Sequence, residues 1–579
     1  MRRLAGYLRR YRARYAAGGA CLLLTATLAM AVPYLLKRAV DAIERGAPFA
    51  TVAQFALAIV AIAVVQSVVR TLSRALIFNV GRDVEHDLRG DLFAHLERLP
   101  VAYYQQQQTG DLMSRLINDV TAIRMLLGVG VLNLVNTPIY YVYGVGIMLT
   151  IDPVLTLMAL LPFPILLWVV KRVSRTLMEQ TLRVQEGLAA LSSAVQENIS
   201  GIHVVKAYDA ETVAVQRFAQ LNDEFSRQNV ALAKVRGRLM PLMRLAAGFG
   251  TLMVLWVGGW QVIAGRIGLG DLVAFMGYLN LLAWPTMALG WMLSILQRGR
   301  AALLRLEHIF ATEPAIADPP DAMPLPAVAG RVEFRNVSFA YPGRGNGHPV
   351  VSNVSFTLEP GEKLAIVGRT GAGKSSLVQL LPRLFDVSEG AVLLDGRDVR
   401  TLPLAQLRGA IGFVPQDPFL FSTRIRDNVA FALDAPDEAA VRRAAAVAGV
   451  ADDIEAFPRG YDTVVGERGI TLSGGQKQRL TLARAVAPAP RVLVLDDALS
   501  SVDTRTEHAI LQGLREVMAG KTSIVIAHRV STIMDADHIA VLDGGRIVEL
   551  GDHAALLARD GLYADLYRQQ QLEDEIETL

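Results

Sequence analysis

The sequence predicts a protein of two halves, an N-terminal all-α membrane half and a C-terminal α/β half. Three observations support this prediction. Apolar residues make up 52% of the 579 residues and are concentrated before about residue 300, which is high for a soluble protein. A proline-rich stretch follows the apolar region. After that stretch, short β-rich runs alternate with helical patterns, as in a domain built on a largely parallel sheet.

The membrane half is predicted to contain about six spanning helices, because six apolar segments are long enough to cross about 30 Å of hydrocarbon. The first segment follows an arginine-rich start, which favours an uncleaved span with a cytoplasmic N-terminus. The single cysteine, Cys21, lies in this span and is expected only to pack. The predicted spans are Ala17–Leu36, Thr51–Val69, Met125–Ile151, Val154–Val170, Leu242–Ala264 and Leu272–Leu296.

The connections between the spans indicate the orientation of the chain. Two of them, Arg70–Arg124 and Lys171–Pro241, are long, charged and helical in pattern, and they share a side with the N-terminus. The Lys and Arg residues near the span ends place that side in the cytoplasm. An even number of spans returns the chain to the same side, so both termini are expected to be cytoplasmic. The short N-terminus, without an organelle-like presequence, favours the inner membrane of a bacterial cell.

Each long connection is expected to extend the spans as cytoplasmic helices and to turn at a tip. The tips lie near Pro100–Gly110 and Glu197–Gly201. A short helix at such a tip can lie in a groove of the C-terminal half and pass its motion to the spans. Spacing alone leaves a simple solvated turn equally open.

Five prolines between Glu313 and Gly330 mark the domain boundary, because such a segment cannot continue a helix. The predicted organisation is a transmembrane domain over 1–312, a linker over 313–330 and an α/β domain over 331–579. The β-rich runs of the α/β domain are Val332–Phe339, Lys363–Val367, Ala391–Leu394, Ile411–Val414, Val492–Leu495, Ser523–Ile526 and His538–Leu542.

A glycine-rich loop, Gly368–Ser375, lies between an apolar run and a helical pattern. Its pattern, G-x-x-x-x-G-K-S, binds phosphate when a strand delivers the loop to a helix N-terminus. The glycines let the backbone curl around phosphates, Lys374 reaches the β- and γ-phosphates, and the Ser375 hydroxyl can ligate Mg²⁺. ATP and Mg²⁺ are therefore the expected cofactors.

A second anion-binding element follows about a hundred residues later. Leu472–Arg479 places a serine and two glycines ahead of a helix, whose N-terminus suits an anion. Arg491–Asp496 is a buried strand that ends in a carboxylate able to hold Mg²⁺. A phosphate loop and a separate anion-binding helix start together predict a head-to-tail dimer, with each ATP held between two domains.

With these elements in order, the sequence resembles the ATP-binding cassette (ABC) superfamily, specifically half-transporters of the type I exporter kind, over nearly the whole chain. The resemblance implies ATP-driven export of a hydrophobic or amphipathic substrate by dimerisation of nucleotide domains. It also implies coupling helices within Tyr103–Val120 and Glu197–Tyr208, an exporter-specific segment at Gly466–Gly469 and a dimer-contact loop at Ser501–Asp503.

The same resemblance implies the roles of individual residues. Tyr341 is expected to stack on adenine, and the other implied nucleotide-binding residues are Gly368, Arg369, Thr370, Gly371, Ala372, Gly373, Lys374, Ser375, Ser376, Asp496, Ser473, Gly474, Gly475 and Gln476. The implied catalytic residues are Asp497, His528 and Gln416, and the implied metal ligands are Ser375, Gln416 and Asp496.

The chain departs from the family pattern at Asp497, where the family has a glutamate that polarises the attacking water. Aspartate is shorter by one CH₂, about 1.5 Å, and a misplacement of that size can cost about 10²-fold in rate. In this family the replacement resembles the weak site of asymmetric exporters, and Leu472–Gln476 is intact. The favoured hypothesis is therefore a heterodimer with a second half-transporter. A homodimer in which Asp497 suffices is the alternative.

Little in the spans identifies a cargo. Polar or aromatic residues that can line a pathway are Asn133, Asn136, Tyr140, Tyr141, Tyr143, Arg244, Asn280 and Trp284, and anchoring is the alternative for the tyrosines. A drug, a lipid or a peptide fits equally well. The net charge of +3, without one basic face, argues against nucleic acid. An ATP-gated regulator or channel without directional transport remains an alternative, and an importer is a weaker one.

Overall fold

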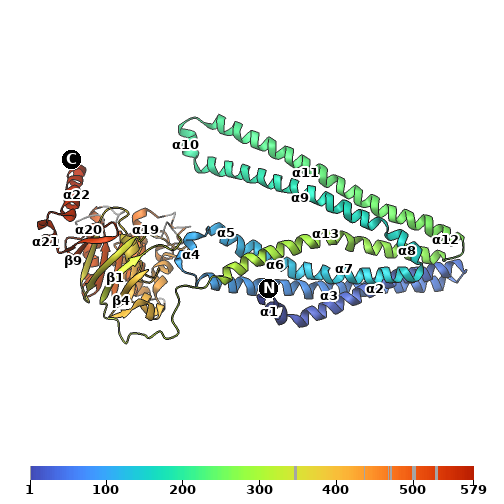
Figure 1. Cartoon of the computed structure of the whole chain (residues 1–579), viewed down its shortest axis with the longest axis horizontal. Helices are drawn as coiled ribbons and strands as arrows, with labels where there is room; N and C mark the ends of the chain where they lie inside the picture. The colour runs from blue at the N-terminus through green and yellow to red at the C-terminus, as the bar shows by residue number, and fades with distance from the viewer. Residues whose placement is uncertain are drawn as a thin grey trace. The chain divides into compact units, whose positions relative to one another are not determined.

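The computed structural model describes residues 2–343, 348–435, 437–466, 469, 472–498, 504–527 and 533–578. The chain forms two compact units (Figure 1). The membrane unit contains Met1–Ala94 and Leu112–Ala311. The α/β unit contains Thr312–Leu579 together with His95–Asp111, a short segment from the N-terminal half of the chain.

The membrane unit is entirely helical, as expected. Its helices are α1 (Arg2–Arg10), α2 (Arg12–Glu44), α3 (Phe49–Leu96), α5 (Thr109–Ser114), α6 (Val120–Met125), α7 (Val131–Ile151), α8 (Pro153–Leu160), α9 (Pro162–Ser200), α10 (Ile202–Ala207), α11 (Glu211–Met253), α12 (Gly259–Ile263) and α13 (Leu269–Ala311). Single π-helical turns, η1 (Arg115–Asp119), η2 (Leu126–Gly130) and η3 (Val254–Gly258), interrupt two of the long rods. No pattern in the sequence predicts these turns.

Among the described residues, four helical segments are long and apolar enough to cross a membrane: Arg12–Glu44, Phe49–Leu96, Thr109–Ile151 and Leu269–Ala311. The other two predicted spans fall in α8–α9 and α11–α12, where several side chains lie outside the described set. The count of six spans therefore stays a prediction. The long predicted connections are helical: α3 runs through to Leu96, while α9 and α11 form a helical hairpin that turns at α10 (Figure 1).

The α/β unit contains two sheets. The antiparallel sheet has the order β2-β1-β4-β5, with β1 (Val332–Phe339), β2 (Val351–Leu358), β4 (Glu389–Leu394) and β5 (Arg397–Asp398). The second sheet has the order β10-β9-β3-β8-β7-β6, with β3 (Lys363–Val367), β6 (Ile411–Val414), β7 (Val492–Asp496), β8 (Thr522–Ile526), β9 (His538–Asp543) and β10 (Arg546–Gly551). All its pairs are parallel except β9 with β10, which confirms the expected parallel core.

Helices cover the parallel sheet. They are α14 (Lys374–Val378), α15 (Leu404–Gly409), α16 (Ile425–Val429), α17 (Glu438–Val447), α18 (Ala451–Ala456), α19 (Gly474–Val486), α20 (Thr504–Met518), α21 (His553–Ala558) and α22 (Leu562–Thr578). The central strands β3, β7 and β8 are buried along almost their whole length, since both faces of the sheet are covered. Strands β2, β5 and β10 were not among the predicted runs.

In the membrane unit, α3 packs closely against the π turn η2 at Gly81. A Cβ added to Gly81 would lie 3.1 Å from the Arg124 carbonyl oxygen and 3.2 Å from the Gly128 nitrogen. Both neighbours are backbone atoms, which cannot rotate away. Gly90, on the same helix, has nothing within 4 Å of such a Cβ. The first glycine therefore permits the helix contact, whereas the second does not serve one.

We predict that Gly81→Leu and Gly90→Leu change stability in opposite directions. Gly81→Leu must push α3 away from η2 and should lower the free energy of unfolding by about 1–3 kcal/mol. Gly90→Leu only replaces a poor helix former and should raise it by up to about 1 kcal/mol. Thermal unfolding of the purified protein in detergent would measure both, and equal shifts for the two variants would contradict the close packing at Gly81.

Candidate nucleotide site and membrane cavity

Five parallel strands end at one edge of the six-stranded sheet, and four of them, β3, β8, β7 and β6, lead into segments with predicted site residues. The pairing register aligns Val414 of β6 with Leu495 of β7, and Asp496 of β7 with Ile526 of β8. Ile366 of β3 pairs with the same Ile526. The segments that follow these strands therefore start side by side, where ligands bind in open parallel sheets.

The phosphate loop leaves β3 at this edge and leads into α14. Gly368, Gly371 and Gly373 have φ angles of +148°, +85° and +97°, which only glycine adopts readily. At Gly373 an added Cβ would also lie 2.7 Å from the Val350 carbonyl oxygen. The glycines of the motif are thus required by the backbone itself.

Lys374 lies within this loop and is only 7% exposed. Its ammonium group donates hydrogen bonds to the carbonyl oxygens of Gly368, at 2.7 Å, and Arg369, at 3.1 Å. Burial lowers the pKa of Lys374 below its ordinary value, and the nearby carboxylates of Asp497 and Asp496 partly oppose that effect. A buried cation held by carbonyl oxygens beside the loop is suited to meet phosphate oxygens.

Ser375 and Asp496 bring two hard oxygen ligands together. The Ser375 hydroxyl donates to Asp496 Oδ1 over 2.9 Å, and Asp496 is 2% exposed at the end of β7. Within the described residues no group of three or more His, Cys, Asp or Glu side chains forms a metal site. Two protein oxygens suit Mg²⁺, which usually takes its remaining ligands from water and phosphate.

Tyr341 is joined to the phosphate loop by its hydroxyl, which lies 2.9 Å from the Ser376 hydroxyl. Its ring packs edge-on against Phe339 and Phe385, with centroid distances of 4.8 and 5.3 Å. The aromatic ring and the phosphate loop are thus held in a fixed position relative to each other.

The predicted catalytic residues are distributed around the same strand ends. Asp497 follows β7 directly; it is 9% exposed and has a φ of +51°, a conformation that aspartate tolerates better than most residues. Gln416 lies two residues beyond β6 and is exposed. His528, which follows β8, and the loop Ser501–Asp503 lie outside the described residues.

The helix start predicted within Leu472–Arg479 is also present. Helix α19 begins at Gly474, and Ser473 caps it: its hydroxyl accepts from the Gln476 backbone N–H over 3.2 Å, while Gln476 Oε1 accepts from the Ser473 N–H over 3.1 Å. The Gln476 amide also donates to Asp453 over 3.1 Å. The Gln476 side chain therefore organises the helix start, whereas the backbone around Gly474 and Gly475 forms its N-terminal turn.

A tip of the membrane half is packed into the α/β unit. The short helix α4 (Val101–Gln106) belongs to this unit, and its Ala102 packs against a hydrophobic core that contains residues of both sheets. The Gln106 amide donates to the Pro342 carbonyl oxygen over 2.9 Å, one residue after Tyr341. The predicted alternative of a merely solvated turn is wrong for this tip. The glutamine run was visible in the sequence, but its contact with Pro342 was not.

Comparisons with known proteins agree with this geometry. Residues 15–286 match a family model described as the ABC transporter transmembrane region, and residues 351–500 match one described as ABC transporter. The multidrug resistance-like ATP-binding protein MdlA of Escherichia coli is 37% identical, over 98% of this chain and 96% of that protein. The chain belongs to the ABC transporter family.

Two further likenesses show the kind of ABC transporter. An ATP-dependent lipid A-core flippase of Syntrophus aciditrophicus is 34% identical, over 99% of this chain and 95% of that protein. The structure of a bacterial Atm1-family ABC exporter with ATP bound superimposes with a TM-score of 0.80 at 32% identity, and covers 97% of this chain and 98% of that one. The chain is a membrane-spanning ABC exporter that binds ATP and couples its hydrolysis to export, and exporters of this family work as dimers of half-transporters.

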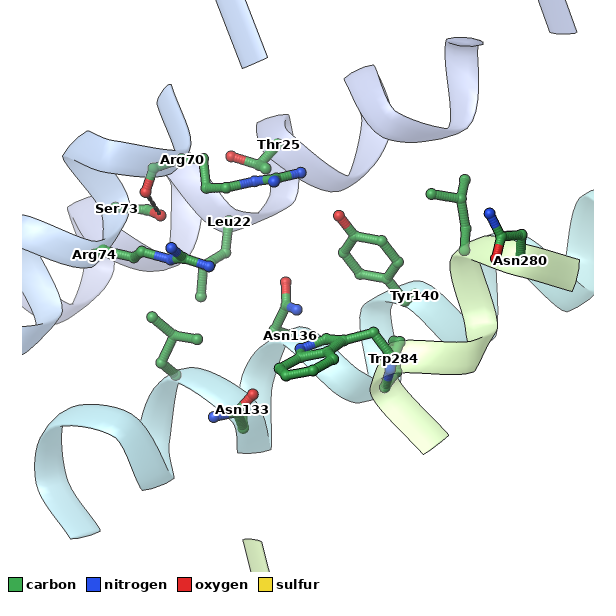
Figure 2. Close-up of a pocket in the computed structure, with 13 residues that line it drawn as sticks. Leu22, Thr25, Arg70, Ser73, Arg74, Asn133, Asn136, Tyr140, Asn280 and Trp284 are labelled. Atoms are coloured by element: carbon green, nitrogen blue, oxygen red, sulfur yellow. Dashed lines mark hydrogen bonds between the residues drawn. The ribbon is translucent and has the colours of Figure 1, made fainter. Parts of the chain in front are cut away.

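The membrane unit of this ABC exporter contains a cavity of about 390 Å³, bordered by α2, α3, α7 and α13 (Figure 2). Five of the predicted pathway residues line it: Asn133, Asn136, Tyr140, Asn280 and Trp284. Tyr141 instead joins two helices, with its hydroxyl 2.6 Å from that of Thr286. Tyr143 does not border the cavity, and the Arg244 side chain lies outside the described residues.

Two cavity residues, Arg70 and Arg74, were not predicted. They lie just beyond the predicted second span, where arginines commonly flank a membrane helix and do not by themselves indicate a cavity. Their spacing of four residues places both on one face of a helix, and this spacing is the sequence pattern that could have predicted a paired role.

We predict that ATP affinity falls as the pH rises through the lowered pKa of Lys374. Phosphate favours the charged ammonium group, so ATP binding takes up a proton wherever Lys374 is partly neutral. Binding of a fluorescent ATP analogue between pH 7 and 10 would measure this effect. In Lys374→Gln, affinity should be weaker and should lose this dependence; an equal slope in both proteins would contradict the assignment.

The lowered pKa of Lys374 also affects the stability of the nucleotide-free protein, which should rise with pH where ATP affinity falls. Between the folded and unfolded pKa values of Lys374, the unfolded chain binds more protons, so this group adds stability as the pH rises through that range. Calorimetry at several pH values would measure both effects. Without ATP, this group should raise the unfolding temperature as the pH rises, and the additional stabilisation by ATP should become smaller over the same range.

Proposed function

We propose that this exporter moves an amphipathic substrate, such as a drug, a lipid or a peptide, out of the cytoplasm across the inner membrane. The observation that carries the proposal is the packing of α4 within the α/β unit, because α4 connects two membrane-spanning helices. A change at Tyr341 reaches this helix through Pro342 and Gln106. The relatives named for multidrug resistance and lipid A flipping support an amphipathic cargo.

The proposed roles in ATP binding follow from the contacts. Lys374 meets the β- and γ-phosphates, the backbone of Gly368–Gly373 encloses them, and Tyr341 faces the adenine. Ser375 and Asp496 hold Mg²⁺, with Gln416 on the neighbouring strand end as a further ligand. When bound, Mg²⁺ would offset negative charge on the phosphates. Asp497 orients the attacking water, with His528 as the second catalytic group, and the start of α19 completes the site of a partner.

Two features support the proposed dimer: the pair of predicted anion-binding elements, and the exposed apolar surface of the hairpin formed by α9 and α11. These two helices pack mainly against each other, and large apolar side chains such as Trp168 and Leu245 are more than half exposed on them. Such surfaces suit lipid or a second half-transporter.

We propose that the partner is a different half-transporter. Asp497 has a side chain one CH₂ shorter than the expected glutamate, so its reach to the attacking water is limited. The intact start of α19 can still serve the partner's site. The exporter would then combine one slow and one fast ATP site.

The first test of the function is directional flux. In vesicles with the α/β unit facing outward, added ATP should drive accumulation of a fluorescent amphiphile inside, and Lys374→Ala should abolish accumulation because the phosphates lose their cation. Single-channel recording on the same preparation is the companion measurement. ATP-dependent conductance without accumulation would contradict export and support the ATP-gated channel.

The second test concerns Asp497. The chain expressed alone in lipid nanodiscs should hydrolyse ATP very slowly, and Asp497→Glu should raise turnover by up to about 10²-fold if position is the main defect. Asp497→Asn, which keeps the size but removes the charge, is the matched control. Clear wild-type turnover that Asn abolishes would show that Asp497 suffices in a homodimer.

A further inference from the structure

Two arginines of α3 project into the membrane cavity. Arg70 and Arg74 are four residues apart, so they lie on one face of the helix, and both border the cavity. Figure 2 shows their guanidinium groups directed toward the space between α2, α7 and α13. Ser73, between them in sequence, is fully buried against the neighbouring helices. This face of α3 therefore turns toward the interior of the helix bundle.

The two positive charges are not balanced locally. The cavity lining contains no aspartate or glutamate, and within the described residues no ion pair joins Arg70 or Arg74 to a carboxylate. Like charges four residues apart on a helix repel each other. Ionisable groups at membrane depth that face a cavity commonly mark a substrate pathway. The Tyr140 hydroxyl is a hydrogen-bond partner of Arg70 but carries no charge, so an anion in the cavity would still relieve the repulsion between the two guanidinium groups.

The remaining walls suit the rest of an amphiphile. Asn133, Asn136 and the Tyr140 hydroxyl offer polar groups from α7, and Figure 2 places Asn136 and Tyr140 opposite the arginines. Trp284 of α13 is 69% exposed and presents a large apolar ring at the rim. Figure 2 shows the Trp284 ring beside Asn136, so a large apolar ring lies next to the polar groups of α7, and a cavity lined by both kinds of group suits an amphiphile.

The depth of the site also fits a cargo taken from the inner leaflet. Arg70 directly follows the predicted span Thr51–Val69, so it lies near the cytoplasmic end of that span. An amphiphile in the inner leaflet carries its charged headgroup at this level. Arginine binds phosphate and carboxylate through paired N–H groups, which makes it a suitable reader of such a headgroup.

We propose that Arg70 and Arg74 form a subsite for the anionic headgroup, phosphate or carboxylate, of an amphiphilic cargo. This inference rests on the proposed function and narrows its substrate class from amphiphiles in general to anionic ones. Neutral amphiphiles enter the same cavity but bind more weakly.

The test is photo-crosslinking to the full-length protein in phosphatidylcholine nanodiscs without nucleotide. The probe is a photoreactive hexadecyl phosphate, and the labelled peptides are located by mass spectrometry. We expect labelling of α3, α7 and α13 around the cavity. Unlabelled hexadecyl phosphate should displace the probe at a concentration about tenfold or more below that needed for hexadecanol, because the charge supplies the extra affinity. Inorganic phosphate should not displace it.

Three variants isolate the charge. R70Q/R74Q should reduce labelling about tenfold or more, since two charge-assisted contacts are lost. R70K/R74K should retain most of it, and thermal unfolding shows whether each variant is folded. R82Q, which removes an exposed arginine further along α3 that does not border the cavity, is the matched control and should label like the wild type.

Each contrary result overturns the proposal in a defined way. Equal labelling of R70Q/R74Q and the wild type, or equal competition by hexadecanol, would show that the arginines do not read the headgroup. Competition by inorganic phosphate would indicate a free-anion site. Labelling confined to lipid-facing residues such as Leu72 would indicate bilayer contact only. Because binding is measured without ATP, its outcome is independent of the flux test: flux of a neutral amphiphile with no anion preference would leave export intact and refute this inference alone.

Discussion

The nucleotide site depends on the parallel pairing of β3, β8, β7 and β6. Parallel strands present all their carboxyl ends at one edge, so residues more than a hundred positions apart in sequence begin their loops together. A slip of one residue in β7 would move Asp496 away from Ser375 and turn it to the other face of the sheet. The burial of β3, β7 and β8 on both faces holds this register, so the catalytic geometry rests on ordinary core packing.

The buried lysine of the α/β unit and the cavity arginines of the membrane unit have different surroundings. In the α/β unit, Lys374 is buried but already bonded to two carbonyl oxygens, and carboxylates lie nearby. The buried ammonium group therefore has hydrogen-bond acceptors that offset part of the cost of its burial. In the membrane cavity, Arg70 and Arg74 have polar neighbours but no carboxylate in the lining. Lys374 of the candidate nucleotide site thus has carbonyl and carboxylate neighbours, whereas the membrane cavity keeps positive charge that a ligand can balance.

The sequence predicted best the features that are local in the chain. The phosphate loop, the helix start at Ser473 and the strand ending at Asp496 each lie within about ten residues, where spacing and turn chemistry determine structure. Strands β2, β5 and β10 were missed because they pair antiparallel at sheet edges and carry weaker apolar signals. The contact of Gln106 with Pro342 and the exposure of Arg70 and Arg74 to a cavity depend on how distant helices pack, which no local pattern encodes. The π turns have no recognised sequence signal.

The position of α4 has a consequence for how the protein can be divided. Because Ala102 packs against the hydrophobic core of the α/β unit, a fragment starting at the linker would lack this contact and would expose the apolar surface beneath it. The α/β unit therefore includes a segment, His95–Asp111, that a fragment starting at the linker would not contain. One of its apolar contacts comes from α4, which precedes most of the membrane helices in the sequence, so a soluble fragment without α4 should be less soluble than one that keeps it.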